Sequence, residues 1–262
     1  MEKIKQADVA GMFYPGEEAS LRQMVDGFIQ KALSFDLRPR AIIAPHAGYI
    51  YSGSIAGTAY KTIAAVRDQI ENVIIMSPAH RFYLRGIALH MADAFATPLG
   101  NIPVNIGIVK KIKQFSSVQW EERSFIQEHG LETHLPFIQR AFKPGIKIVP
   151  MIVGECQESE VAEILESVWE DPRNFVIISS DLSHFHSYAD AKKLDRNTVD
   201  LIQNLDSQSL DTEFACGHYP ICGLLNLARN RKLKIKALDI RSSGDTAGSK
   251  ESVVGYGSFA VY

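Results

Sequence analysis

Four short runs of apolar, largely β-branched residues constrain the fold of this chain most strongly. They are AIIA at 41–44, VIIM at 73–76, IKIVPMIV at 146–153 and FVII at 175–178. Because a strand that is buried on both faces has no polar alternation, each run is typical of a strand in the middle of a sheet. We therefore expect a core built on a sheet that is covered on both sides.

Helical patterns separate these runs. Residues 21–33 place apolar side chains at i, i+3, i+4 and i+7, and similar patterns span residues 54–66, 158–169 and 191–205. This alternation predicts an α/β fold with a mostly parallel central sheet and helices on both faces.

The end of the chain follows another pattern. Residues 237–243 and 252–262 combine glycines with alternating apolar residues, which indicates late strands nearer an edge of the sheet. No repeat or flexible linker interrupts the sequence, so residues 1–262 are predicted to form a single domain.

The composition excludes several classes of protein. With 46% hydrophobic residues and a formal net charge of −2, the chain is a folded protein without a basic surface for nucleic acid. No apolar stretch approaches the roughly 20 residues that cross a bilayer, so neither membranes nor nucleic acids are expected partners. The first residues lack the apolar run of a secretory signal, and we expect a cytoplasmic protein. Its three cysteines, an odd number without CxxC spacing, argue against a disulfide framework.

Three of the predicted strands are each followed by a histidine, namely His46, His80 and His184. In open α/β sheets, ligands bind beyond the carboxyl ends of the strands. A single histidine at such a position is most simply a hydrogen-bonded cap. Three equivalent positions favour a shared crevice with a metal ion, since neutral imidazole is a common metal ligand.

An anionic ligand would complete such a site, and the residues offer Asp181 and Cys216. Cys216 comes just before a predicted helix in which Pro220 suits the first turn, and a helix N-terminus favours a thiolate. Burial as a small residue is the alternative for Cys216. Cys222 within that helix is predicted to be a core thiol, whereas Cys156 has no identified partner.

The segment EHGLETHLP at 128–136 is a further cluster of polar residues. His129 and Glu132 can share a helical face, but His134 does not fall on it. A hydrogen-bonded helix entry and a wall of the site are both consistent with this spacing. His218 lies beside Cys216 and is a candidate to support the site. The chain contains no phosphate-binding loop, GxGxxG or GxSxG motif.

Five blocks of the sequence together resemble the Memo family, whose archaeal and bacterial members are also called AmmeMemoRadiSam system protein B. They are RAIIAPHAGYIYSG at 40–53, SPAH at 77–80, EHGLETHLPF at 128–137, SSDLSHF at 179–185 and CGHYPI at 216–221. The resemblance implies a fold similar to that of class III extradiol dioxygenases, which are non-haem Fe(II) enzymes that open catechol rings.

The resemblance also implies a role for each matching residue. His46, His80 and Cys216 correspond to the proposed metal ligands, and His184 to an acid/base that Asp181 orients. The pocket would be lined or supported by His129, Glu132, His134, Tyr49 and His218. A thiolate replaces the carboxylate ligand of the dioxygenases, and this softer donor shifts the preference toward copper(I) or zinc. The position after Cys216-Gly217 also departs from the Arg-His often found there, since this chain has His218-Tyr219.

These implications give two expectations for function. The first is a metal-binding protein with one ion, Fe(II) or copper before zinc, acting as an oxidoreductase on a small phenolic or oxygen-bearing substrate. The second is a non-catalytic binding or signalling module that recognises a peptide, small molecule or protein in the same crevice. The family name implies gene neighbourhood with a radical-SAM protein and therefore a shared pathway.

Overall fold

The computed structural model describes residues 2–262. The helices are α1 (Glu18–Lys31), α2 (Tyr49–Lys61), α3 (Ile106–Ile112), α4 (His129–Glu132), α5 (His134–Ala141), α6 (Glu158–Trp169), α7 (Tyr188–Gln203) and α8 (His218–Asn230). The strands are β1 (Ile4–Lys5), β2 (Ala41–Ala44), β3 (Asn72–Pro78), β4 (Ile87–Leu89), β5 (Ala94–Thr97), β6 (Gly100–Pro103), β7 (Val118–Trp120), β8 (Lys147–Val153), β9 (Asn174–Ser179), β10 (His184–His186), β11 (Ile235–Ser242) and β12 (Val253–Val261).

A mixed sheet of nine strands forms the centre of the part of the chain that the structure describes. Its middle is parallel, in the order β2, β9, β3 and β8. Antiparallel pairing extends it at both ends, through β12 against β2 and β4 against β8. Strand β11 pairs with β12 at an edge, as the pattern of the late strands predicts. The predicted α/β class is confirmed, with its parallel part at the centre.

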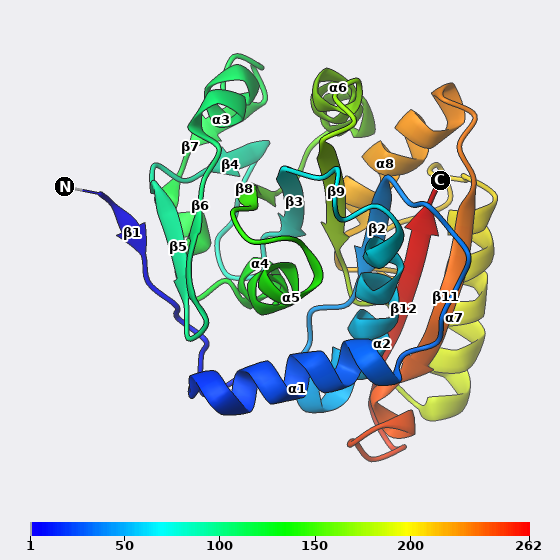
Figure 1. The fold of residues 1–262 in the computed structure, drawn as a ribbon. Coiled ribbons are helices and arrows are strands. Elements are labelled where there is room, and N and C mark those ends of the chain that lie inside the picture. Colours follow the sequence, from blue (N-terminus) through cyan, green and yellow to red (C-terminus); the bar gives the residue numbers. More distant parts are fainter. Residues whose placement is uncertain (1) are drawn as a thin grey trace.

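Helices cover both faces of this sheet (Figure 1). Helices α1, α2 and α5 pack against one another on one side, and α6 packs against α8 on the other. Helix α7 lies along β11 and β12. Among residues 2–262, no helix has both the length and the apolar character needed to cross a bilayer.

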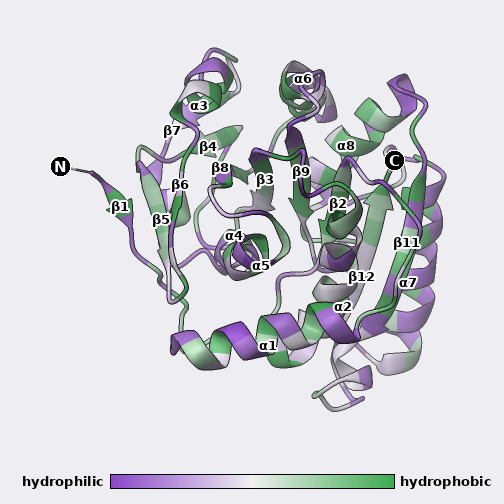
Figure 2. Cartoon of the chain, in the orientation of Figure 1, coloured by the Kyte–Doolittle hydropathy of each residue, from purple (hydrophilic) through white to green (hydrophobic). Residues whose placement is uncertain are grey.

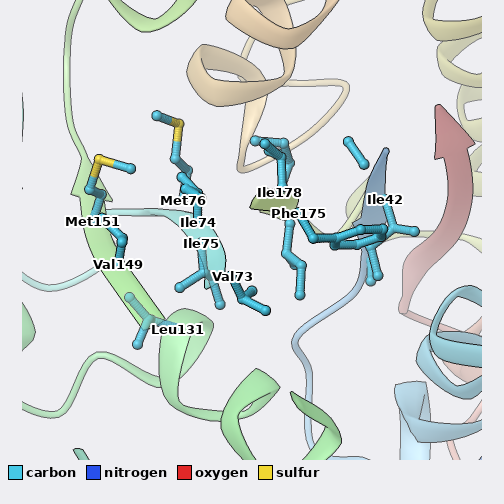
Figure 3. Packing of buried hydrophobic residues seen from close by; sticks show 14 of the residues in the cluster. Ile42, Val73, Ile74, Ile75, Met76, Leu131, Val149, Met151, Phe175 and Ile178 are labelled. Carbon is cyan, nitrogen blue, oxygen red and sulfur yellow. The ribbon is translucent and has the colours of Figure 1, made fainter. Parts of the chain in front are cut away.

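The core consists mainly of the central strands. Every residue of β2, β3 and β9 is buried, and the central strands are largely hydrophobic in Figure 2. Figure 3 shows their side chains projecting from the sheet, with Leu131 of α4 packed in the same cluster. Each fully buried Val, Ile or Leu side chain contributes about 1.5–3 kcal/mol of transfer free energy, so the sheet provides a rigid support for the loops at its edge.

The strands formed by the apolar runs and the long helices agree closely with the predictions, whereas the strands of the second sheet do not. Strand β2 and helix α6 have the predicted bounds, but α2 begins at Tyr49, five residues before the predicted start. A second sheet of β1, β5 and β6 was not predicted, because these strands lack the unbroken β-branched run that marks β2.

Candidate metal centre

The parallel strands place three polar residues at equivalent positions. His46, His80 and Asp181 each stand two residues beyond the end of a strand, β2, β3 and β9 respectively. Because these strands are neighbours and parallel, the three loops leave the sheet at the same edge. Regular pairing of the core strands thus brings together residues that are far apart in sequence.

The ligand atoms of His46, His80 and Cys216 all lie within 4.8 Å of one another. The Nε2 atom of His46 is 3.4 Å from the Sγ atom of Cys216. A nitrogen and a sulfur bound to one tetrahedral ion, with bonds of about 2.1 and 2.3 Å, are separated by roughly 3.5 Å. The three donors therefore have the spacing of ligands to a single cation.

Glu128 fixes the orientation of His80. The carboxylate accepts the backbone N–H of His80 and its ring Nδ1–H, both at 2.7 Å. The same carboxylate caps α4 by accepting the N–H of Gly130. Since Nδ1 is engaged, Nε2 is the nitrogen of His80 that is available to a cation.

Charge also couples the groups around His80. Burial lowers the pKa of His80, but hydrogen bonds with Cys216 and Glu128 outweigh this effect and raise it to about 10. Burial raises the pKa of Glu128, yet the hydrogen bond to His80 brings it below its ordinary value. A cation that binds here must displace the proton of His80, because only unprotonated imidazole coordinates.

His46 is buried and neutral. Its backbone N–H donates to Oδ1 of Asp181 at 2.9 Å, and its Nδ1 lies 2.6 Å from Oγ of Ser179. Burial, followed by the charges of His80 and His129, holds the pKa of His46 well below its ordinary value. Its imidazole is therefore in the form that binds metals.

Cys216 is held at the start of α8. Its Sγ accepts the backbone N–H of Asp181 at 3.3 Å. Gly217 then caps the helix, and a Cβ atom on it would lie 2.5 Å from the carbonyl oxygen of Ser179. Only glycine permits this close approach, which brings the thiol from a distant part of the chain to the end of β9.

Asp181 lies beside the ligand His46, whereas His184 lies on a separate strand, β10. Burial raises the pKa of Asp181 to about 7, although the N–H of His46 acts in the opposite direction. His184 lies on β10, which pairs with β12. Burial lowers the pKa of His184, and its charge lowers the pKa of both His46 and His129. His184 is thus a neighbour of the site rather than a member of the ligand cluster.

His129 lies directly against the cluster. Its ring stacks between Phe13 and His80, with centroid distances of 4.5 and 4.6 Å, and meets His46 edge-on at 5.4 Å. Burial, with the charge of His80, lowers the pKa of His129 to about 4. This neutral ring forms a wall of the site.

Glu132 binds the N-terminal segment of the chain and is not one of the clustered ligands. Its carboxylate accepts the backbone N–H groups of Asp8 and Val9 and the hydroxyl of Tyr14, at 2.8, 2.9 and 2.7 Å. Burial, then the charge of Glu132, raises the pKa of Tyr14, which keeps its proton. Glu132 therefore anchors the N-terminal segment that carries Phe13.

Tyr49, His134 and His218 are also buried. The hydroxyl of Tyr49 donates to the carbonyl of Thr133 at 2.7 Å, so it supports the segment between α4 and α5. His134 contacts Ser179 behind His46. His218 begins α8, and its ring lies 3.8 Å from that of Tyr219.

Three contributors to the site were not predicted: Glu128, Ser179 and Phe13. Glu128 precedes a short helix, and an acidic residue at that position is a recognisable helix cap. Ser179 is the last residue of a buried strand, which is a signal for a residue at the binding edge. Phe13 comes from the N-terminal segment and carries no pattern that links it to the histidines.

Comparisons with known proteins agree with the blocks found in the sequence. A family model described as Memo-like protein matches residues 5–260. A MEMO1 family protein of Aquifex aeolicus is 31% identical over 268 residues, covering 97% of each chain. One of Metallosphaera sedula is 34% identical over 272 residues and 95% of each chain, and one of Thermoplasma acidophilum is 33% identical over 265 residues, covering 95% of this chain and 96% of its own.

Proposed function

Since the chain belongs to the Memo-like family, we propose that it binds one transition-metal ion and acts as an oxidoreductase on a small phenolic or other oxygen-bearing substrate. The ligands are His46, His80 and Cys216. The observation that carries the proposal is the convergence of their donor atoms within 4.8 Å. In addition, the Nδ1 atoms of both histidines are engaged by other groups, so both rings present Nε2 to the same point.

The donor set fits Fe(II) or copper, with zinc as the redox-inactive alternative. Two neutral imidazoles suit all three metals, and the thiolate favours the softer ones. Three protein ligands leave positions for substrate or water, and a bound redox metal would supply electron transfer to dioxygen.

His184 serves in this proposal as the group that accepts or donates a substrate proton. Its pKa is lowered by burial, so the ring is neutral near pH 7 and able to accept a proton. Asp181 binds the backbone of His46, so we assign to it the positioning of the loop that carries this ligand. The pairing of β10 with β12 holds the backbone of His184 in place.

Oxygen consumption tests the oxidoreductase proposal. The protein is reconstituted anaerobically with Fe(II) or Cu(I) and mixed with dioxygen and a panel of catechols and other phenols. We expect uptake that depends on metal and is lost in His184→Gln, while this variant keeps its metal content. Stoichiometric metal without uptake on any phenol would overturn the oxidoreductase assignment.

A binding function has one specific observation in its favour. Large apolar side chains lie close in sequence to the site residues: Ile50 in α2, Tyr83 in the loop after β3 and Phe185 in β10 are 62%, 76% and 78% exposed. Exposed apolar groups of this kind occur at recognition surfaces. If the crevice is only a recognition site, His80→Ala and Phe185→Ser weaken the capture of a partner equally with and without metal. Partner capture that depends on metal occupancy would argue against a recognition site that works without metal.

A further inference from the structure

A buried chain of hydrogen bonds runs from His46 into the core, on the side away from the thiol. Oγ of Ser179 lies 2.6 Å from Nδ1 of His46 and 2.9 Å from Nε2 of His134. The same Oγ donates to the carbonyl oxygen of Gly130 at 2.6 Å. On the other side of His134, Nδ1 lies 2.9 Å from the hydroxyl of Tyr60. All four side chains, from His46 to Tyr60, are at least 98% buried.

The number of protons determines the direction of each bond. A carbonyl oxygen can only accept, so the single hydroxyl proton of Ser179 is directed to Gly130. The lone pairs of Oγ then face the two histidine nitrogens, and both nitrogens must donate. His46 therefore carries its proton on Nδ1. His134 carries its proton on Nε2 and accepts the hydroxyl proton of Tyr60 on Nδ1.

Both rings are neutral in this arrangement. Both rings are at most 1% exposed, and a buried imidazolium without an anionic hydrogen-bond partner is costly. A neutral imidazole has one N–H, so a proton on Nδ1 of His46 leaves a lone pair on Nε2, the nitrogen that faces Cys216. The opposite tautomer would set two lone pairs against each other across 2.6 Å.

We propose that Ser179, supported by His134 and Tyr60, is a positioning residue that fixes the tautomer of His46 and so keeps Nε2 ready for a cation. This inference rests on the proposed metal site. The two histidine ligands are thus oriented by different groups. The carboxylate of Glu128 orients His80, and the neutral chain of hydrogen bonds that ends at Ser179 orients His46. This uncharged chain of hydrogen bonds sets the tautomer of His46 without placing a second carboxylate beside the ligands.

Nitrogen NMR of the metal-free protein tests the tautomer directly. In ¹⁵N-histidine-labelled protein near pH 7, two-bond proton–nitrogen correlations distinguish protonated from unprotonated ring nitrogens, and His46→Asn assigns the signals. We expect His46 to be protonated on Nδ1 in the wild type and to populate both tautomers in Ser179→Ala. A wild-type His46 that is protonated on Nε2 overturns the proposal, and this result does not depend on metal binding.

Metal affinity gives a second readout, measured by competition with a chromophoric chelator. Loss of an outer partner of a ligating histidine typically weakens metal binding about 10- to 100-fold, so we expect such a loss in Ser179→Ala and a smaller one in Tyr60→Phe. Ser124→Ala is the matched control, because Ser124 is a buried serine that also donates to a backbone carbonyl, that of Glu121. Unchanged tautomer and affinity in Ser179→Ala overturn the proposal. A wild type with the expected tautomer but no metal affinity instead contradicts the metal function.

Discussion

Glu128 binds His80 twice, through the backbone N–H and through the ring Nδ1–H, at 2.7 Å in both cases. The two residues are 48 positions apart, and the carboxylate is buried. Both oxygens are used, so the ring and the loop that carries it are oriented by the same group. A metal ligand that is fixed in this way loses little conformational freedom when a cation binds.

Replacing Glu128 by glutamine tests this relationship. The amide can accept only on one side, and its NH2 group would face a donor of His80. We expect the affinity for the metal to fall about 10- to 100-fold, measured by chelator competition. Glu121→Gln is the control, since this partly buried carboxylate also accepts a backbone N–H and side-chain N–H groups, but those of Arg123. Equal affinity in Glu128→Gln and the wild type would contradict the assigned role.

Gly130 is predicted to be intolerant of a side chain. A Cβ atom there would lie 2.5 Å from Oγ of Ser77 and 3.1 Å from Cε1 of His80. We expect Gly130→Ala to lower the free energy of unfolding by about 1–3 kcal/mol and to weaken metal binding.

Gly27 provides the matched control on α1, because a Cβ atom there meets nothing within 4 Å. Gly27→Ala should stabilise the protein by about 0.5–1 kcal/mol, since alanine favours a helix interior. Urea unfolding measures both variants. Similar changes in the free energy of unfolding for the two variants would show that the close packing at Gly130 does not contribute to stability.

Removal of the Tyr14 hydroxyl should affect stability but not metal binding. That hydroxyl donates to the buried carboxylate of Glu132, which also holds the backbone of Asp8 and Val9. Hydrogen bonds to charged groups contribute about 1.5–3 kcal/mol, and we expect Tyr14→Phe to lose an amount in this range. Metal affinity should stay within twofold of the wild type. A large loss of affinity with unchanged stability would place Glu132 in the site after all.

His134 should make the protein sensitive to acid. Burial lowers its pKa from 6.5 to about 3, so below pH 6.5 the unfolded chain takes up a proton that the folded protein does not. Its contribution to stability is therefore complete above pH 6.5 and is lost as the pH falls toward 3, with a slope of up to about 1.4 kcal/mol per pH unit. His134→Gln should reduce the pH dependence of the free energy of urea unfolding between pH 7 and 5. Parallel curves for the two proteins would contradict this.

The main features of the fold could be predicted because they depend on long, uniform patterns. Strands β2, β3 and β9 are buried throughout and mostly apolar, and their parallel direction follows the rule that strands buried on both faces are parallel. The equivalent positions of His46 and His80 follow from the same rule. The second sheet was missed because β5 (AFAT) and β6 (GNIP) have no run of β-branched residues, unlike β2 (AIIA).

The supporting contacts of the site could not be predicted in the same way. Glu132 has the spacing of a pocket residue on α4, yet its carboxylate binds the distant backbone of Asp8 and Val9. Ser179 meets two histidines only after β9 and α5 have packed. Such contacts depend on tertiary packing, and the spacing of residues along a single helix or strand carries no information about it.

The most direct test of the account is the metal content and sulfur coordination of anaerobically purified protein. Wild type, Cys216→Ser and Cys156→Ser are compared by elemental analysis and by X-ray absorption at the metal edge. We expect one metal per chain with one sulfur and two imidazole ligands in the wild type and in Cys156→Ser, because Cys156 is a half-buried cysteine outside the proposed ligand set. Cys216→Ser should lose the sulfur scatterer and most of the metal. Equal metal content and an unchanged sulfur signal in Cys216→Ser would contradict the proposed centre.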